Sequence, residues 1–342
     1  MTPGELCIMR KTIIISIGLV LIIICVCAAV SFATRTDEHV ERIMNDHRPL
    51  DFEQIKDEQT SLLLNEDYFN HQFTFPTGVL TQDQKIYILD GKENCINIFD
   101  QEGKLLEQIG STGNGKLQFM APHQICYFDN QFYILDSGNY RVQILKDDYS
   151  YGGERKLQQL VDEDYGSQYD FSYSDMAIDK TGNIYVSSVT TRPKNAHIYK
   201  IDKNGIIYQI GDNLVGYLAS IDGEIFFANN MTIVSGYIKG TFRDYTMPYE
   251  TYLSKLENDQ LTTIKELPFQ YFNSSLAYDD NNLFIFSGTY DTLDHFDKNG
   301  NYMSTLYEFE KDSDIKYLAY DQDERFFVAT DPVNSKVYFL QE

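Results

Sequence analysis

Two stretches of this chain decide its fold: residues 85–100 read KIYILDGKENCINIFD, and residues 131–146 read QFYILDSGNYRVQILK. The second stretch repeats the pattern of the first at an offset of 46 residues, and Pro76 is matched by Pro122 at the same offset. In both copies aromatic or β-branched residues alternate with others and are followed by Asp, Asn and Gly, which is typical of short strands joined by turns. A period of this length with no helical pattern predicts a repeating all-β unit.

Weaker copies of the same unit continue toward the C-terminus. Each pairs one short apolar run with a second run a few residues later: 176–179 with 183–186, 217–220 with 224–227, 276–279 with 283–286, and 318–321 with 325–328. The chain therefore contains six units. Because one small sheet cannot bury both of its faces alone and must stack against neighbours, the repeat predicts an all-β, six-bladed β-propeller with four-stranded blades.

The last unit lacks a strand of its own. It ends at Val337–Leu340, which corresponds to the third strand of the other units. We expect the apolar run Leu62–Leu64, just before the first unit, to supply the fourth strand and to close the ring so that no sheet edge stays open. The predicted propeller domain is therefore 62–342.

An uncharged segment precedes the repeats. Residues 12–33, TIIISIGLVLIIICVCAAVSFA, are long enough to cross a bilayer as one transmembrane helix or an uncleaved signal anchor. Arg10 and Lys11 lie before the segment and acidic residues follow it, so residues 1–11 are expected in the cytoplasm and the rest outside.

The end of that segment leaves a second outcome open. Ser31, Phe32 and Ala33 also fit the small-residue pattern of a signal-peptidase site, and cleavage after Ala33 would make the protein secreted. Residues 34–61 are polar and of mixed charge, which is typical of a stalk between membrane and domain.

Composition narrows the class of partner. The formal net charge is −23, which argues against nucleic acid because phosphate binding needs Lys and Arg. A solvated acidic surface explains that charge better than a specific cationic ligand does. Cys95 and Cys126 are the two cysteines beyond the apolar segment, and they are expected either to form a disulfide or to be two buried thiols.

Residues 136–144, DSGNYRVQI, resemble the consensus of the NHL repeat: Asp at the end of a strand, a polar turn, Asn, Arg, and a strand that starts with Val-Gln. The resemblance is close over 75–146 and holds only as a pattern beyond it. It implies a six-bladed propeller. In this motif we expect Asp136, Asn139 and Arg141 to hydrogen-bond across the turn and fix it, which is a structural role.

Propellers similar to NHL proteins include lactonases and related hydrolases with a metal in the central tunnel, so the resemblance also implies an alternative function, a metal-dependent tunnel-site hydrolase. The histidines are widely spaced, no paired metal-ligand motif or nucleophile elbow is found, and no catalytic residue is assigned. No cofactor is predicted, and the spacing of the 51 Asp and Glu residues neither places nor excludes a calcium site.

Two insertions suggest that the protein binds a partner and does not catalyse a reaction. Residues 147–172 and 229–251 are expected to emerge, with the Asp136–Arg141 turn, on one face of the propeller, where long loops on a rigid scaffold often bind partners. This rim is rich in tyrosine, which either recognises a ligand or packs the loops down. Its tyrosines are Tyr140, Tyr149, Tyr151, Tyr165, Tyr169, Tyr237, Tyr245 and Tyr249. The sequence thus favours a membrane-anchored extracytoplasmic binding or sensor module for a protein, peptide or glycan.

Overall fold

The structure is a computed structural model that describes residues 35–36, 62–157, 171–190, 196–211, 214–238, 241–247, 252–267, 273–288, 290–311 and 313–341. It divides into two compact units, one of 48–232 and 248–342 and the other of 1–47 and 233–247. The first unit is an all-β ring. In the second, the described chain includes a hairpin in which β18 pairs with the end of β17.

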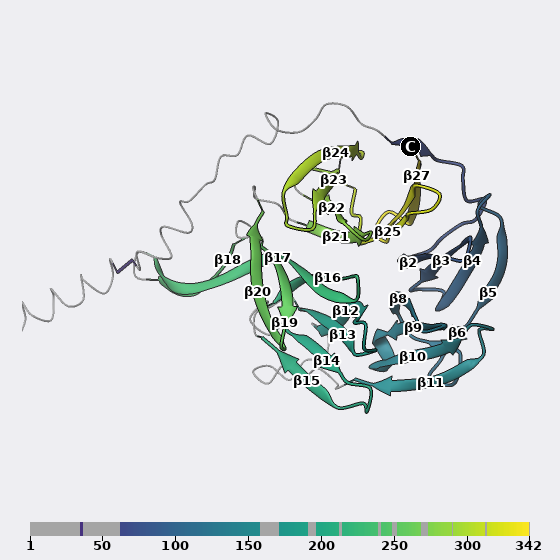
Figure 1. Cartoon of the computed structure of the whole chain (residues 1–342), viewed down its shortest axis with the longest axis horizontal. Coiled ribbons are helices and arrows are strands. Elements are labelled where there is room, and N and C mark those ends of the chain that lie inside the picture. Colours follow the sequence, from purple (N-terminus) through teal and green to yellow (C-terminus); the bar gives the residue numbers. More distant parts are fainter. Residues whose placement is uncertain are drawn as a thin grey trace, which may run out of the picture. The chain divides into compact units, whose positions relative to one another are not determined.

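Six antiparallel sheets, one per repeat, form the blades of the ring (Figure 1). Each has four strands in blade order, and in the fourth β18 is an additional strand that pairs with β17. We letter the strands of each blade a to d from the centre outward. The a strands are β2 (Pro76–Gln82), β8 (Pro122–Phe128), β12 (Phe171–Ile178), β16 (Val215–Ile221), β21 (Asn273–Tyr278) and β25 (Tyr317–Asp321). The b strands are β3 (Lys85–Asp90), β9 (Gln131–Asp136), β13 (Ile184–Thr190), β17 (Glu224–Ile238), β22 (Asn282–Ser287) and β26 (Phe326–Asp331).

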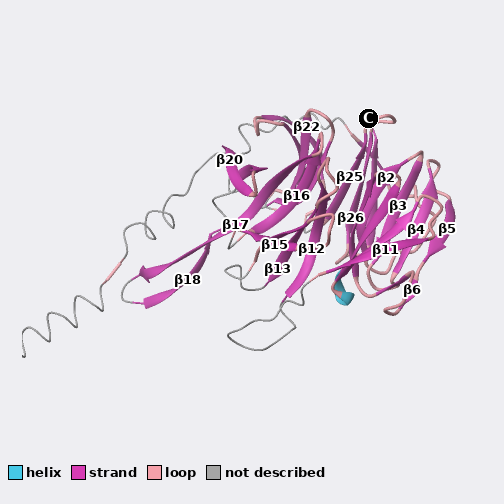
Figure 2. Ribbon diagram, turned by 60° about the horizontal axis from the view of Figure 1, so that its bottom comes forward, coloured by secondary structure: helices cyan, strands magenta, loops and turns pink. Residues whose placement is uncertain are grey.

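The c strands are β4 (Cys95–Asp100), β10 (Arg141–Lys146), β14 (Ile198–Ile201), β19 (Tyr252–Glu257), β23 (Thr292–Asp297) and β27 (Lys336–Gln341). The d strands are β5 (Leu105–Ile109), β11 (Tyr151–Lys156), β15 (Ile207–Ile210), β20 (Gln260–Glu266), β24 (Tyr302–Glu308) and β1 (Leu63–Asn65). Three short elements and one hairpin strand complete the set: β6 (Ser111–Thr112), β7 (Gln118–Phe119), the 3-10 helix η1 (Ser137–Asn139) and β18 (Thr241–Met247). Figure 2 shows η1 in cyan among strands in magenta.

The six-bladed, all-β prediction is confirmed. Each a strand contacts the a strands of the blades before and after it, and β25 contacts β2, so the ring is complete. Among the described residues no helix is long and apolar enough to cross a bilayer. The predicted transmembrane helix at 12–33 and nearly all of the predicted stalk at 34–61 lie outside the described residues.

The core consists of six apolar layers, one between each pair of neighbouring blades. The period of a strand is two, so neighbouring side chains enter different layers. In β3, Ile86 and Ile88 pack toward blade 6, whereas Tyr87 and Leu89 pack toward blade 2. Because both faces of a blade are buried, the b strands are nearly continuous apolar runs, which is why the repeats stand out in the sequence.

The ring closes through β1. This strand pairs antiparallel with β27, with Leu63 opposite Gln341 and Leu64 opposite Leu340. It thereby becomes the d strand of blade 6, and the Leu62 side chain enters the layer between blades 5 and 6. This is the run from which the sequence analysis expected the missing strand.

Both expected insertions contain strands. Residues 147–172 include the whole of β11, the d strand of blade 2, and the start of β12. The sequence of β11, YGGERK, has no alternating apolar residues because it is the outermost strand and is largely half-exposed or exposed. Residues 229–251 extend β17 and form β18, so the described part of this insertion is a β-hairpin.

Candidate functional site

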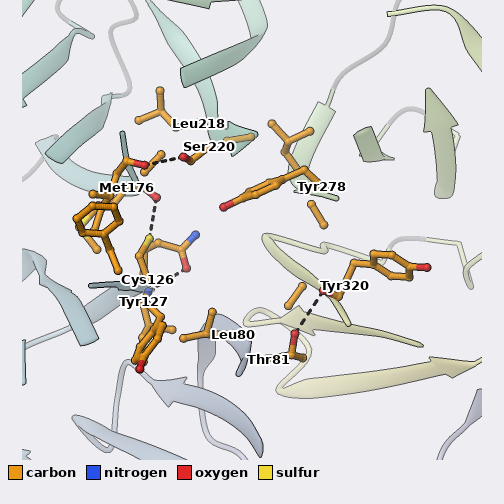
Figure 3. A pocket seen from close by; sticks show the side chains of 18 of the residues that line it. Leu80, Thr81, Cys126, Tyr127, Met176, Leu218, Ser220, Tyr278 and Tyr320 are labelled. Atoms are coloured by element: carbon orange, nitrogen blue, oxygen red, sulfur yellow. Dashed lines mark hydrogen bonds between the residues drawn. The ribbon is translucent and has the colours of Figure 1, made fainter. Parts of the chain in front are cut away.

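The six blades surround a cavity at the centre of the ring. Since the strands of a blade alternate in direction, all a–b and c–d turns lie on one face of the ring, and all b–c and d–a connections lie on the other. We call these the a–b face and the b–c face. A cavity of about 540 Å³ is lined by the second halves of all six a strands and therefore lies toward the a–b face (Figure 3).

Hydrogen bonds between neighbouring blades fix the walls of this cavity. Cys126 Sγ donates to the Met176 carbonyl at 3.2 Å, and Ser220 Oγ donates to the Ile178 carbonyl at 2.5 Å. On the other side, Thr81 Oγ1 donates to a carbonyl of blade 6 at 3.3 Å. These small polar side chains bind carbonyl groups of neighbouring blades and hold the blades in place, so the cavity is present before any ligand binds.

Tyr278 differs from the other wall residues because its ring stands in the cavity. It is the last residue of β21, its side chain is 41% exposed, and Figure 3 shows the ring directed toward the centre. Burial raises the pKa of its hydroxyl, against a backbone hydrogen bond at Ser220 that lowers it, and the hydroxyl is neutral at physiological pH. It offers an aromatic face and a neutral hydroxyl group to whatever enters.

A buried carboxylate lies behind the inner end of the cavity. Asp175 is 3% exposed; its Oδ1 accepts hydrogen bonds from Gln124 Nε2 and from the Met176 backbone N–H, both at 2.8 Å. Its Oδ2 accepts one from the Leu218 backbone N–H at 2.7 Å. Burial raises the pKa of Asp175 to about 6, against the hydrogen bonds, which lower it. One side chain thus joins blades 2, 3 and 4.

A second contact crosses the ring next to Asp175, at the inner end of the cavity. Tyr317, on blade 6, donates its hydroxyl hydrogen bond to the Ser174 carbonyl of blade 3 at 3.1 Å. Between blades 1 and 2 the packing is so close that a Cβ on Gly78 would lie 2.6 Å from Gln124 Cα. Of these residues only Gln124 lines the cavity. The cavity is therefore bounded toward the b–c face and opens toward the a–b face.

We expect Asp175 to give the protein a component of stability that weakens as the pH rises. Its folded-state pKa of about 6 lies above the ordinary value of 3.8, so proton binding favours the folded state. This contribution is fully present below pH ~4 and is lost as the pH rises through 6. Between pH 5 and pH 7.5 the loss amounts to about 1 kcal/mol.

Urea unfolding of the wild type and of Asp175→Asn at the two pH values measures this loss. Burial lowers the pKa of His71, His123 and His295, so these groups stabilise in the opposite sense. They are shared by both proteins, and the difference in pH dependence between the proteins isolates Asp175. An identical pH dependence in the two proteins would contradict the expectation.

The Asp136 motif lies on the b–c face. Asp136 is fully buried; its Oδ2 accepts from Arg141 Nε at 2.8 Å and from Asn139 Nδ2 at 2.9 Å, and its Oδ1 accepts from the Met120 backbone N–H at 2.7 Å. Arg141 also donates to the carbonyls of Asn114, Gly115 and Gln118. These side chains fix the turn and fasten the connection between blades 1 and 2 to it.

The described rim tyrosines are not gathered on one rim. Tyr140 packs in the layer between blades 2 and 3. Tyr149 lies in the turn between β10 and β11, on the a–b face, and its hydroxyl is 3.1 Å from that of Tyr87. Tyr151 begins β11 and therefore lies near the same turn. The separation arises because residues 151–156 form a strand, so these two tyrosines do not belong to the connection between blades 2 and 3.

The side chains of the remaining predicted rim tyrosines lie outside the described residues, so their positions on the rim are not compared with those of Tyr140, Tyr149 and Tyr151. Tyr237 lies in β17 and Tyr245 in β18, and their side chains are outside the described residues. Tyr165, Tyr169 and Tyr249 lie wholly outside the described residues. The binding role of the rim stays a prediction.

The two cysteines are free thiols. Cys95 is buried in blade 1, and Gln108 Nε2 donates to its sulfur at 3.3 Å, while Cys126 lines the cavity. Burial raises the pKa of Cys95 to about 11 and also raises that of Cys126. Of the two arrangements that the sequence left open, the structure has two separate thiols in their neutral form.

Sequence reasoning did not find the cavity. Tyr278 belongs to a Leu-Ala-Tyr-Asp run that was recognised only as a strand, and nothing local indicates that its ring faces the centre. Asp175 carries a signal that could have been used, because a charged residue directly before the apolar run Met176–Ile178 is unusual in a buried strand.

In the part of the chain that the structure describes, no three His, Cys, Asp or Glu side chains lie together as the ligands of a metal would. The metal-dependent hydrolase therefore stays an alternative predicted from the resemblance. The described residues supply no ligand set for it.

Comparison with known proteins identifies the fold. A family model described as "6-bladed beta-propeller" matches residues 72–329. The solved virginiamycin B lyase from Staphylococcus aureus is similar, with 12% identity, a TM-score of 0.52, and coverage of 82% of this chain and 99% of that chain. Luciferin-regenerating enzyme is similar at 11% identity and a TM-score of 0.55, covering 82% of this chain and 95% of that one.

The calcium-binding protein regucalcin from Agrobacterium tumefaciens is similar at 10% identity and a TM-score of 0.50, with coverage of 79% of this chain and 90% of that one. No curated protein sequence matches the chain. At these identities the likeness is one of fold.

Proposed function

The chain belongs to a family described as 6-bladed beta-propellers, and from this premise we propose that it is a binding module whose ligand enters the central cavity from the a–b face. The observation that carries the proposal is a preformed cavity of about 540 Å³, bounded at its inner end, with the ring of Tyr278 exposed inside it. Ligand pockets commonly measure roughly 300–1,000 Å³ and combine apolar walls with a few polar groups.

The volume indicates the size of the ligand. It suits a small molecule or the end of a peptide or glycan chain, and it is too small for a folded domain. We further propose that the module acts outside the cytoplasm, tethered by the apolar segment 12–33, because basic residues precede that segment and acidic residues follow it. In this role the propeller would bind or sense its ligand near the membrane surface.

The proposal predicts that Tyr278→Ala weakens ligand binding at least about tenfold, because an aromatic side chain at the centre of a binding site commonly contributes more than 1 kcal/mol. The full chain, purified in a non-ionic detergent, is applied to peptide and glycan arrays, and the compounds that bind are titrated by calorimetry. Tyr278→Phe is expected to retain most of the binding that depends on the aromatic face.

Tyr208→Ala is the matched control. Tyr208 is 45% exposed, nearly as much as Tyr278, but it lies on β15, the outermost strand of blade 3. Its replacement is expected to leave binding unchanged. If every compound that binds the wild type bound Tyr278→Ala and Tyr208→Ala equally well, the cavity would not be the binding site.

A further inference from the structure

The a–b face carries an excess of acidic residues around the opening of the cavity. Each of the six a–b connections contributes at least one carboxylate, for eight in all, against two basic residues, Lys180 and Arg325. The carboxylates are Asp83, Asp129, Asp179, Asp222, Asp279, Asp280, Asp323 and Glu324, and Asp321 ends the adjacent strand β25. These connections directly follow the strands that line the cavity, and two of their carboxylates, Asp179 and Asp222, line it themselves together with one base, Lys180.

Lys180 is also near a carboxylate outside the a–b connections, Glu224. The hydrogen bond from Lys255 is the main cause that lowers the pKa of Glu224, and the positive charges of Lys180 and Lys298 lower it further. Asp179 stays ionised, because hydrogen bonds from Asn183 and Thr181 lower its pKa although burial acts against them. The opening therefore keeps a net negative charge at neutral pH.

The inner end of the cavity is negative as well. The groups that hydrogen-bond to Asp175 are the Gln124 amide and two backbone N–H groups, and none of them carries a positive charge. The carboxylate acts on the cavity walls: burial is the main cause that raises the pKa of Cys126 and Tyr278, and the charge of Asp175 raises both further. A charge that reaches both walls makes the space between them favourable for a cation.

The aromatic rings of the cavity also favour a cation. Tyr278 and Tyr127 both line the cavity, and Figure 3 shows the ring of Tyr278 in the open space. The face of a tyrosine ring attracts a cation, by about 0.5–2 kcal/mol depending on desolvation. A group that is both cationic and partly apolar would satisfy the rings and the carboxylates together.

We infer that the central cavity selects an organic cation, an ammonium or guanidinium group, which enters between the carboxylates of the a–b turns and packs on Tyr278. The inference rests on the proposed function and names the chemical class of its ligand. Two sources carry such a group: a small free amine or guanidine, and the basic end of a peptide.

Probes of matched shape and different charge test this preference. The small probes are butylammonium, butylguanidinium, neutral butylurea and anionic butyrate; the peptide probes are Arg-Gly-Gly amide and its analogue with citrulline in place of arginine, both with acetylated N-termini. Binding to the full chain in a non-ionic detergent at pH 7.5 is followed by saturation-transfer NMR and by competition. We expect the cations to bind at least tenfold more tightly than the neutral probes, and butyrate to bind least. Cation affinity should fall as salt is raised from 20 to 300 mM.

Two variants locate the site. Asp222→Asn is expected to weaken cation binding about three- to tenfold with little change for butylurea, and Tyr278→Ala is expected to weaken both cations and butylurea. Glu310→Gln makes the same charge change at an exposed position that does not line this cavity, and it should leave all affinities unchanged.

The outcomes separate the two proposals. Equal or tighter binding of butylurea or butyrate that is lost in Tyr278→Ala would overturn the cation preference and leave the binding cavity in place. If no probe and no array compound showed binding that depends on Tyr278, both proposals would fall. Stronger binding of the arginine peptide than of butylguanidinium would identify a peptide as the source, and the reverse order a small molecule.

Discussion

Replacing Arg141 by Met is expected to lower the free energy of unfolding by about 3–5 kcal/mol, because it leaves a buried carboxylate without its cation. Asp136 is fully buried, and Arg141 Nε donates to it at 2.8 Å. The guanidinium also pairs with Glu154 at 3.0 Å and donates to three carbonyls of the connection between blades 1 and 2. Methionine preserves much of the volume and none of these hydrogen bonds.

Chemical denaturation of the full chain, followed by tyrosine fluorescence, measures the loss. Arg155→Met is the matched control, because Arg155 is a half-exposed arginine on the neighbouring strand β11, and its expected effect is below about 1 kcal/mol. In Asp136→Asn/Arg141→Met the buried charge is gone, so this double variant should lose less than the sum of the single variants. If the free energy of unfolding of Arg141→Met were within about 1 kcal/mol of the wild-type value, the Asp136–Arg141 pair would not hold the turn.

Gly78→Ala is expected to destabilise the protein by about 2–3 kcal/mol, since the added methyl group has no room between the a strands of blades 1 and 2. Its Cβ would lie 2.6 Å from Gln124 Cα and 2.7 Å from the His123 carbonyl oxygen, and both are backbone atoms. Relief requires β2 and β8 to move apart. That movement would also displace Gln124 from Asp175, so the inner boundary of the cavity would be disturbed.

Gly91→Ala provides the control for this substitution. Neither glycine has a positive φ, and a Cβ on Gly91 would lie 3.1 Å from a Thr77 methyl carbon and 3.2 Å from the ring of Phe75, both side chains that can adjust. Its expected cost is below about 1 kcal/mol, relative to the 2–3 kcal/mol expected for Gly78→Ala. Equal denaturation midpoints for the two variants would mean that the close approach of β2 and β8 is not required.

The fold could be predicted from the sequence because its main signal is local. In a propeller both faces of every b strand are buried, so runs such as Lys85–Asp90 and Gln131–Asp136 are apolar at consecutive positions and recur with the blade. The outermost strand β11 gave no such signal, since it is partly exposed and contains two glycines. Its residues were therefore expected to form a loop.

The candidate site could not be predicted in the same way. Whether an a-strand residue faces the centre depends on how six blades meet, and this geometry has no local counterpart in the sequence. Tyr278 and Tyr320 occupy the same place in the repeat, yet Tyr278 stands in the cavity, while Tyr320 lies close to the rings of Phe284 and Phe327. The acidic a–b turns were visible as Asp-rich clusters, but only the ring places all six around one opening.

The closure by β1 and β27 also constrains the order of events during biosynthesis. β1 leaves the ribosome before every other strand of the ring, and its partner β27 leaves last. Until then β1 has no partner strand, and the layers on the two sides of blade 6 lack Phe339, Tyr338 and Leu340 of β27. A nascent chain that stalls before residue 336 therefore leaves one edge of β26 unpaired and both layers incomplete, which favours aggregation. The native ring forms only after synthesis of its last strand, so a chaperone that protects this chain must act on nearly its full length.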